Sequence, residues 1–303
     1  MRWNPVFWKE ITVDSRSVRL PVVIFIFNLI LSAAAIFNIC NLNMHARLTA
    51  EIQYSAILEL YSLISTLEFV MLLLLMPALT APAICGEREK DTLDVLVSTS
   101  IHPRSIVTGK LGSAQTEMLV LLLSALPVQS LVFIFGGVTM PDIILVFITY
   151  VAAVMYIGGI GIFCSALFRK NVMSNAASYM ATAILTAGTF AACRFYGLLR
   201  FGQGVFEMYG GTAAGAGKLM YLLLFNPAVT FACVINLQAG SGDTLEKLAS
   251  PAGPVPRNMI TANWIPVSLV LQIAAAFLLI GGAIWLITPG RGRQDRRKLQ
   301  EES

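Results

Sequence analysis

Six of the eight residues from Glu87 to Asp94 are charged, in the order Glu-Arg-Glu-Lys-Asp-Thr-Leu-Asp. Residues 69–86 before this octet and residues 118–141 after it contain no charged side chain. A bare charge in the hydrocarbon core of a bilayer costs several kcal/mol. The octet is therefore expected to lie in water at a membrane surface, on a loop between two membrane spans.

The octet is suited to recognising another protein rather than to catalysis. Leu93 and Leu96 are three residues apart, so on a helix they form a short apolar edge together with Thr92. The charged side chains around this edge are Glu87, Arg88, Glu89, Lys90 and Asp94. Such an edge can enter a groove while its charged rim fixes the register. We expect a docking surface for a soluble partner, with a merely solvated loop as the alternative.

Two acidic residues, Glu68 and Glu117, each lie inside an otherwise apolar predicted span. A carboxyl group there is costly unless it faces a cavity or a partner. One interpretation is a hydrogen-bonded or protonated packing residue. The other is that Glu68 or Glu117 lines a transport pathway and meets a cationic group on the cargo.

The composition requires a membrane protein. Of 303 residues, 56% are hydrophobic and 13% are charged, against about 25% charged in soluble domains. The formal net charge of +4 gives no reason to expect nucleic acid as a partner. The five cysteines form no CxxC pair and the two histidines lie far apart, so neither a metal site nor a His-based catalytic site is expected.

The apolar runs predict six spans, because a spanning helix needs about 20 residues. The predicted spans are 20–43, 60–84, 107–136, 143–168, 171–193 and 262–287. A seventh candidate, 219–238, is interrupted by Asn226-Pro227. We interpret 196–260 as an external loop whose helical hairpin re-enters the membrane between spans five and six without crossing it.

The distribution of basic residues predicts the orientation. With six spans, 15 of the 21 Lys and Arg residues lie on the side of the termini and 6 on the other side. The positive-inside rule then places both termini, the 86–104 loop and the basic tail 288–303 in the cytoplasm. Residues 1–303 are thus expected to form a single all-α integral membrane domain.

Residues 1–19 are expected to form an interfacial helix before the first span. Trp3, Phe7 and Ile11 recur at helical spacing, and Lys9 lies on the opposite face. Trp8 adds a second tryptophan to this segment. Tryptophan is enriched at the headgroup level of bilayers, so the segment is predicted to lie on the cytoplasmic surface.

Residues 77–96 resemble the segment that ends the second span and forms the coupling helix in type-2 ABC transporter permeases. The family's Gly-Glu-Arg-Glu run is present at 86–89, its Leu-Asp pair at 93–94, and its Ser/Thr-rich stretch with a proline at 97–104. Residues 4–10 resemble the family's N-terminal interfacial segment, and 225–227 its Asn-Pro turn. One departure is Asp91, where glycine is common; we expect it to strengthen the helix.

The resemblance implies a division of labour between chains. The Gly-Lys-Leu segments at 109–111 and 217–219 lack the upstream glycine and the following Ser/Thr of a phosphate-binding loop. The chain is therefore expected to be no enzyme itself and to bind no cofactor. A separate cytoplasmic ABC ATPase subunit would bind ATP and Mg²⁺. A second permease chain, identical or related, would complete the pathway.

The resemblance also assigns residues and a location. The ATPase-docking residues would be Glu87, Arg88, Glu89, Thr92, Leu93, Asp94 and Leu96. The complex would be an exporter in the cytoplasmic (inner) membrane of a bacterium. The alternatives are an ATP-independent channel or an ion-coupled secondary transporter using Glu68 or Glu117, a membrane-embedded enzyme, and a non-transporting scaffold. A requirement for ATP would separate the exporter from the first two.

Overall fold

The computed structural model describes residues 4–49, 54–91, 102–134, 138–201, 218–240, 244–249 and 258–288. All regular secondary structure in these ranges is helical. Six helical segments are long and apolar enough to cross a membrane, namely Arg19–Cys40, Leu58–Glu89, Pro103–Ser130, Met140–Leu167, Asn171–Phe195 and Trp264–Ile287. The predicted all-α architecture with six candidate spans is thus confirmed.

The described part of the chain consists of helices separated by turns and by segments that lie outside the described ranges. The N-terminal half contains α1 Pro5–Ser15, α2 Arg19–Thr49, α3 Tyr54–Thr80, α4 Pro82–Glu89 and α6 Pro103–Ile134. The second half contains α7 Met140–Leu167, α8 Asn171–Ala183, the π-helix η1 Ile184–Gly188, α9 Thr189–Phe201, the 3₁₀-helix η2 Lys218–Phe225, α11 Pro227–Gln238, α12 Thr244–Ala249, α13 Met259–Ala262 and α14 Trp264–Ile287.

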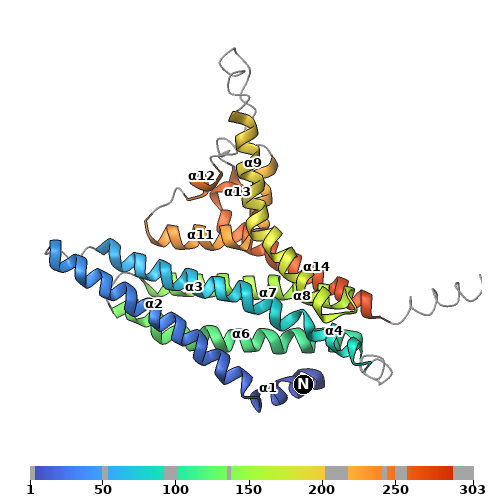
Figure 1. The fold of residues 1–303 in the computed structure, drawn as a ribbon. Helices are drawn as coiled ribbons and strands as arrows, with labels where there is room; N and C mark the ends of the chain where they lie inside the picture. Colours follow the sequence, from blue (N-terminus) through green and yellow to red (C-terminus); the bar gives the residue numbers. More distant parts are fainter. Residues whose placement is uncertain are drawn as a thin grey trace, which may run out of the picture.

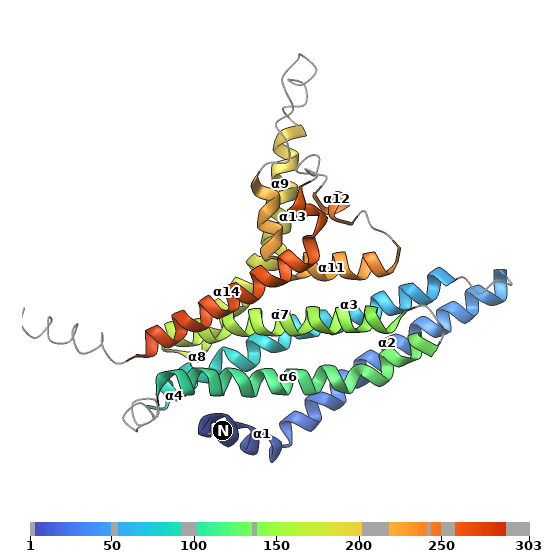
Figure 2. The same ribbon diagram turned by 180° about the vertical axis from the view of Figure 1, so that it is seen from behind.

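The four helices α2, α3, α6 and α7 form a slab, and α14 crosses its α7 face (Figure 1, Figure 2). At one end of the slab lie α1, α4 and the start of α6. At the opposite end lie the beginnings of α3 and α7. Helices α9, α12 and α13 project from the slab on the α14 side.

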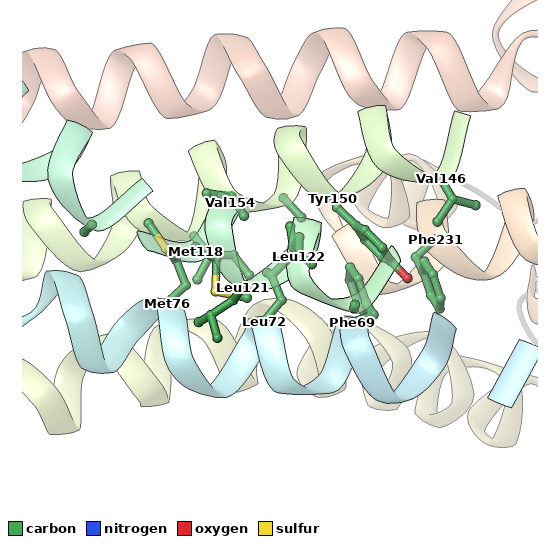
Figure 3. Close-up of a cluster of buried hydrophobic side chains, with 14 of the residues drawn as sticks. Phe69, Leu72, Met76, Met118, Leu121, Leu122, Val146, Tyr150, Val154 and Phe231 are labelled. Atoms are coloured by element: carbon green, nitrogen blue, oxygen red, sulfur yellow. The ribbon is translucent and has the colours of Figure 1, made fainter. Parts of the chain in front are cut away.

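The core lies where α3, α6 and α7 meet (Figure 3). Its buried side chains include Phe69, Leu72, Met76, Met118, Leu121, Leu122, Val146, Tyr150, Val154 and Phe231. Glycine allows α7 to approach its neighbours closely: a Cβ on Gly161 would lie 2.8 Å from Thr80 Cβ. Small residues at helix contacts are typical of helix packing in membranes, where backbones approach one another.

The second span is longer than predicted. Helix α3 ends at Thr80, and α4 continues almost without interruption from Pro82 to Glu89. Pro82 is tolerated because it occupies the first turn of α4, where its missing N–H has no intrahelical partner. The first three residues of the charged octet therefore lie on the end of a spanning helix, whose last residue is Glu89.

The predicted break at Asn226-Pro227 is confirmed. Asn226 is fully buried, and its Oδ1 accepts hydrogen bonds from Ala228 N at 2.8 Å and Val229 N at 3.4 Å, which caps α11. Its Nδ2 donates to Thr186 O in η1 at 2.8 Å and to Thr189 Oγ1 at 2.6 Å. The 12 residues of α11 extend about 18 Å, too short to cross a hydrocarbon core of about 30 Å. The re-entrant placement of this hairpin stays a prediction.

Candidate functional site

Lys110 joins three helices at the end of the slab where the charged octet begins. Its Nζ lies 3.1 Å from Glu87 Oε1 on α4 and 3.2 Å from Glu10 Oε1 on α1. Lys110 is 7% exposed, and its two partners are about one-fifth exposed. We call Glu10, Glu87 and Lys110 the charged triad. The sequence showed Lys110 only as a basic residue, because no local pattern indicates that it pairs with Glu10, which lies 100 residues away in the chain.

Helix α1 lies directly against α6. Asn4 caps α1 through Val6 N, and its side chain exchanges hydrogen bonds of 2.7 Å with Ser105. A Cβ on Gly109 would lie 2.9 Å from Val6 Cβ, so this contact requires glycine at position 109. The N-terminal helix is thus built onto the start of α6 and carries Glu10 into the charged triad.

The interfacial residues predicted in α1 have different surroundings. Phe7 is half-buried against α6, where a Cβ on Gly112 would lie 3.2 Å from its ring. Trp8 is 52% exposed and Lys9 is exposed. Trp3 lies outside the described residues. Phe7 therefore faces α6 rather than a lipid surface, and the position of α1 at a membrane interface stays a prediction.

Arg88 and Glu89 bind the corner between α7 and α8. The Arg88 guanidinium donates to Ala166 O at 3.1 Å and Phe168 O at 3.4 Å, at the C-terminal end of α7. Glu89 Oε2 accepts from Asn171 N at 3.3 Å, at the N-terminus of α8. Each charge complements the helix end that it meets. The carbonyl groups that end α7 thus accept hydrogen bonds from the Arg88 guanidinium.

A second contact fixes α4 on α7. Ser165 Oγ accepts hydrogen bonds of 2.9 Å from the backbone N–H groups of both Ile84 and Cys85. All three residues are buried. These groups lie at the N-terminal end of α4, where the amides have no intrahelical acceptor. Helix α4 is therefore held at both ends by α7.

The chain leaves α4 through a left-handed residue. Lys90 ends the helix, and Asp91 has φ 54°, a conformation that favours glycine. The expectation that Asp91 strengthens the helix is wrong, because Asp91 lies beyond the helix in the turn that ends it. Asp tolerates this conformation better than most residues. The other predicted docking residues, Thr92, Leu93, Asp94 and Leu96, lie outside the described residues, so the docking edge stays a prediction.

Glu68 and Glu117 have unlike environments. Glu68 is 1% exposed in the middle of α3, and Gln129 Nε2 on α6 donates to its Oε2 at 2.5 Å. Glu117 is half-buried on α6, beside the carboxyl group of Asp14 on α1. Lys110 and Glu117 share the side of α6 that meets α1, as their spacing predicts.

A buried polar cluster behind the Asn226 turn was not foreseen. Gln272 of α14 donates to Leu224 O at 3.3 Å and to Thr230 Oγ1 at 2.8 Å. Ser268 donates to Leu224 O at 2.9 Å. The sequence signal was the occurrence of polar residues on an apolar span at i and i+4, which a search for charged residues overlooks. The cluster attaches the η2–α11 hairpin to the last span.

The described cysteines are all free thiols, and no group of three or more His, Cys, Asp or Glu side chains among the described residues is arranged to hold a metal ion.

No protein-family model matches the chain, and no curated protein matches it. The resemblance to type-2 ABC permeases therefore rests on the residues of the chain itself. The structure adds that the charged C-terminal end of α4 contacts α1, α6, α7 and α8.

Proposed function

We propose that the chain is the membrane-spanning permease subunit of an ATP-driven ABC exporter. A separate cytoplasmic ATPase subunit would hydrolyse ATP, and this chain would convert its closure into movement of the spans. Both termini would lie in the cytoplasm of a bacterial cell, with a second permease chain beside this one. The placement of α4 is the observation that carries the proposal.

Helix α4 is built to transmit a displacement. It continues α3, contacts α1 and α6 through the charged triad, and contacts α7 and α8 through Arg88 and Glu89. A partner that displaces the segment after Glu89 would therefore act on several spans at once. We take the spans to have two arrangements in equilibrium. A partner shifts that equilibrium only if it binds one arrangement more tightly than the other, and an ATPase that changes shape can do so.

Exposed apolar faces support a bilayer and a second chain as partners. Phe25 and Phe37 on α2 are 67% and 70% exposed, and Phe277 and Leu278 on α14 are 60% and 77% exposed. Large apolar side chains that are this exposed are suited to contact lipid or another apolar surface. Lipid or a second permease would cover them.

An ion-coupled transporter is the second candidate, because Glu68 is a buried carboxyl group within a span. The two candidates differ in their partner. An exporter purified gently should bring down a soluble subunit with a phosphate-binding loop, and its transport should stop without ATP. Transport by the chain alone, with no such subunit bound, would exclude the exporter.

The docking edge can be tested by one matched pair of variants. Leu93→Ala should reduce recovery of the ATPase subunit, because truncating a buried interface leucine costs about 1 to 3 kcal/mol, a factor of roughly 5 to 150 in affinity. Leu123→Ala, on an exposed position of α6, is the control. Both variants should insert into the membrane normally. Equal recovery of the partner by the two variants would remove the docking role.

A further inference from the structure

We infer that Glu68 is a proton-binding site, at the inner end of a series of polar groups that leads to the end of the slab where α3 and α7 begin. The ligand is the proton alone: the carboxylate takes one proton to become a carboxylic acid and returns it. The inference goes beyond the proposed exporter function and does not depend on ATP or on a partner chain.

The surroundings of Glu68 favour the acid form. Glu68 is 1% exposed, and no ion pair involves it in the described ranges. Gln129 donates to one carboxyl oxygen, while the other, Oε1, has no hydrogen-bond donor. A buried carboxylate with one neutral donor and no counter-charge carries a desolvation cost that the acid form avoids.

The neighbouring titratable groups do not offer a positive charge. Tyr150 of α7 lies beside the Glu68 carboxyl group, and Tyr61 of α3 and Asp142 of α7 lie further toward the end of the slab. The Tyr150 hydroxyl donates its hydrogen to Ser65 O at 2.9 Å. With its hydrogen directed at Ser65, the Tyr150 hydroxyl oxygen can accept from an acid O–H on Glu68.

A line of polar side chains runs from Glu68 along α3. Tyr61, Ser65 and Glu68 share one helix face and are 3%, 0% and 1% exposed. The Ser65 hydroxyl is buried without a hydrogen-bond partner, next to the similarly unpaired Glu68 Oε1. The two ends of this line, Tyr61 and Glu68, are about 10 Å apart along the helix axis.

The line reaches partly exposed groups at the end of the slab. The Tyr61 hydroxyl donates to Gln238 Oε1 at 3.0 Å, and Gln238 Nε2 donates to Asp142 O at 2.9 Å. Gln238 and Asp142 are both half-buried. Apolar rings flank the Tyr150 ring in this region, since Phe69 and Phe231 stack at 4.4 Å and Phe231 and Tyr150 at 6.0 Å (Figure 3).

A larger ligand does not fit the same geometry. A hard cation such as Ca²⁺ needs six or more oxygen ligands, and no cluster of three acidic or histidine side chains occurs in the described residues. A cationic cargo would need open space at the carboxyl group, and Glu68 is closed off by Gln129, Tyr150 and the core. A proton needs one unpaired oxygen and a route of hydroxyl groups.

Infrared spectroscopy of the full chain in lipid vesicles tests the site directly. At neutral pH, the carbonyl-stretch band of a protonated carboxylic acid should be present, should disappear in Glu68→Gln, and should shift when water is exchanged for D₂O. Glu117→Gln, the control, should retain the Glu68 band. If Glu68→Gln fails to fold, Glu68→Asp should move the same band to a new frequency.

The route is tested by the rate of that D₂O shift. Tyr61→Phe removes one hydroxyl group and should slow the shift at least about tenfold. Tyr156→Phe, which changes a buried tyrosine on another face of α7, should leave the rate unchanged. A spectrum without an acid band assignable to Glu68 overturns the proton site. A band that never shifts in D₂O, or that shifts equally fast in Tyr61→Phe, overturns the exchange route.

Discussion

Lys110→Met should destabilise the protein by removing the positive charge between Glu10 and Glu87 while keeping an apolar stem. The Lys110 Nζ lies 3.2 Å and 3.1 Å from the two carboxylates, and the three side chains are 8%, 23% and 21% exposed. An exposed ion pair is worth about 0–1 kcal/mol, and breaking a buried pair costs about 3–5 kcal/mol. Since the lysine is buried and its two partners are partly exposed to solvent, we expect the free energy of unfolding to fall by an amount between these limits, about 2 kcal/mol.

The measurement is the apparent unfolding temperature in detergent at one fixed scan rate. Domains of 150–250 residues shift by about 2–4 °C per kcal/mol, so Lys110→Met should lower the midpoint by about 4–8 °C. Lys9→Met, at an exposed position on α1, changes the net charge equally and is the control. Replacing both glutamates by Gln in the Lys110→Met background should recover part of the loss, because no unpaired carboxylate remains.

The result that would refute this reasoning is a Lys110→Met midpoint within error of the Lys9→Met midpoint. A triple variant no more stable than Lys110→Met would also contradict it, because the loss would then come from packing rather than from two stranded carboxylates. Either outcome would mean that the charged triad is not what holds α1 and α4 on α6.

Two further stability predictions use the same assay. Gly161→Ala should cost about 1–3 kcal/mol, because the new Cβ would lie 2.8 Å from Thr80 Cβ, whereas Gly281→Ala meets nothing within 4 Å and should be neutral or stabilising; equal midpoints for the two would contradict the close contact of α3 and α7. Asn226→Ala removes the α11 cap and two donated hydrogen bonds, at a cost of about 2–4 kcal/mol. Asn236→Ala, which removes one bond within its own helix, should cost less than about 1 kcal/mol, and equal losses would contradict the role of the Asn226 turn.

The number of candidate spans could be predicted from the sequence, because the signal is local. Each span is a run of about 20 mostly apolar residues with very few charges, because hydrocarbon tolerates few exceptions. The break at Asn226-Pro227 was equally local, since proline has no N–H to donate and restricts the residue before it. The likeness of residues 86–89 to a coupling segment also lay within a few consecutive positions.

The end of the second span could not be predicted in the same way. Glu87, Arg88 and Glu89 read as loop residues, yet they lie in α4, whose last residue is Glu89. The helix continues because Lys110, the carbonyl groups that end α7 and the amide that begins α8 satisfy these three charges. Those partners are distant in sequence, so no local pattern contains them.

The sequence by itself determined which segments must be helical and apolar, because bilayer thickness and backbone hydrogen bonding act on consecutive residues. Only the tertiary structure decided which polar groups meet. Glu68 accepts a hydrogen bond from Gln129, 61 residues away in the chain, and Lys110 pairs with Glu10, 100 residues away. Such pairs depend on how helices pack, and packing sums many weak contacts over the whole chain rather than over one segment.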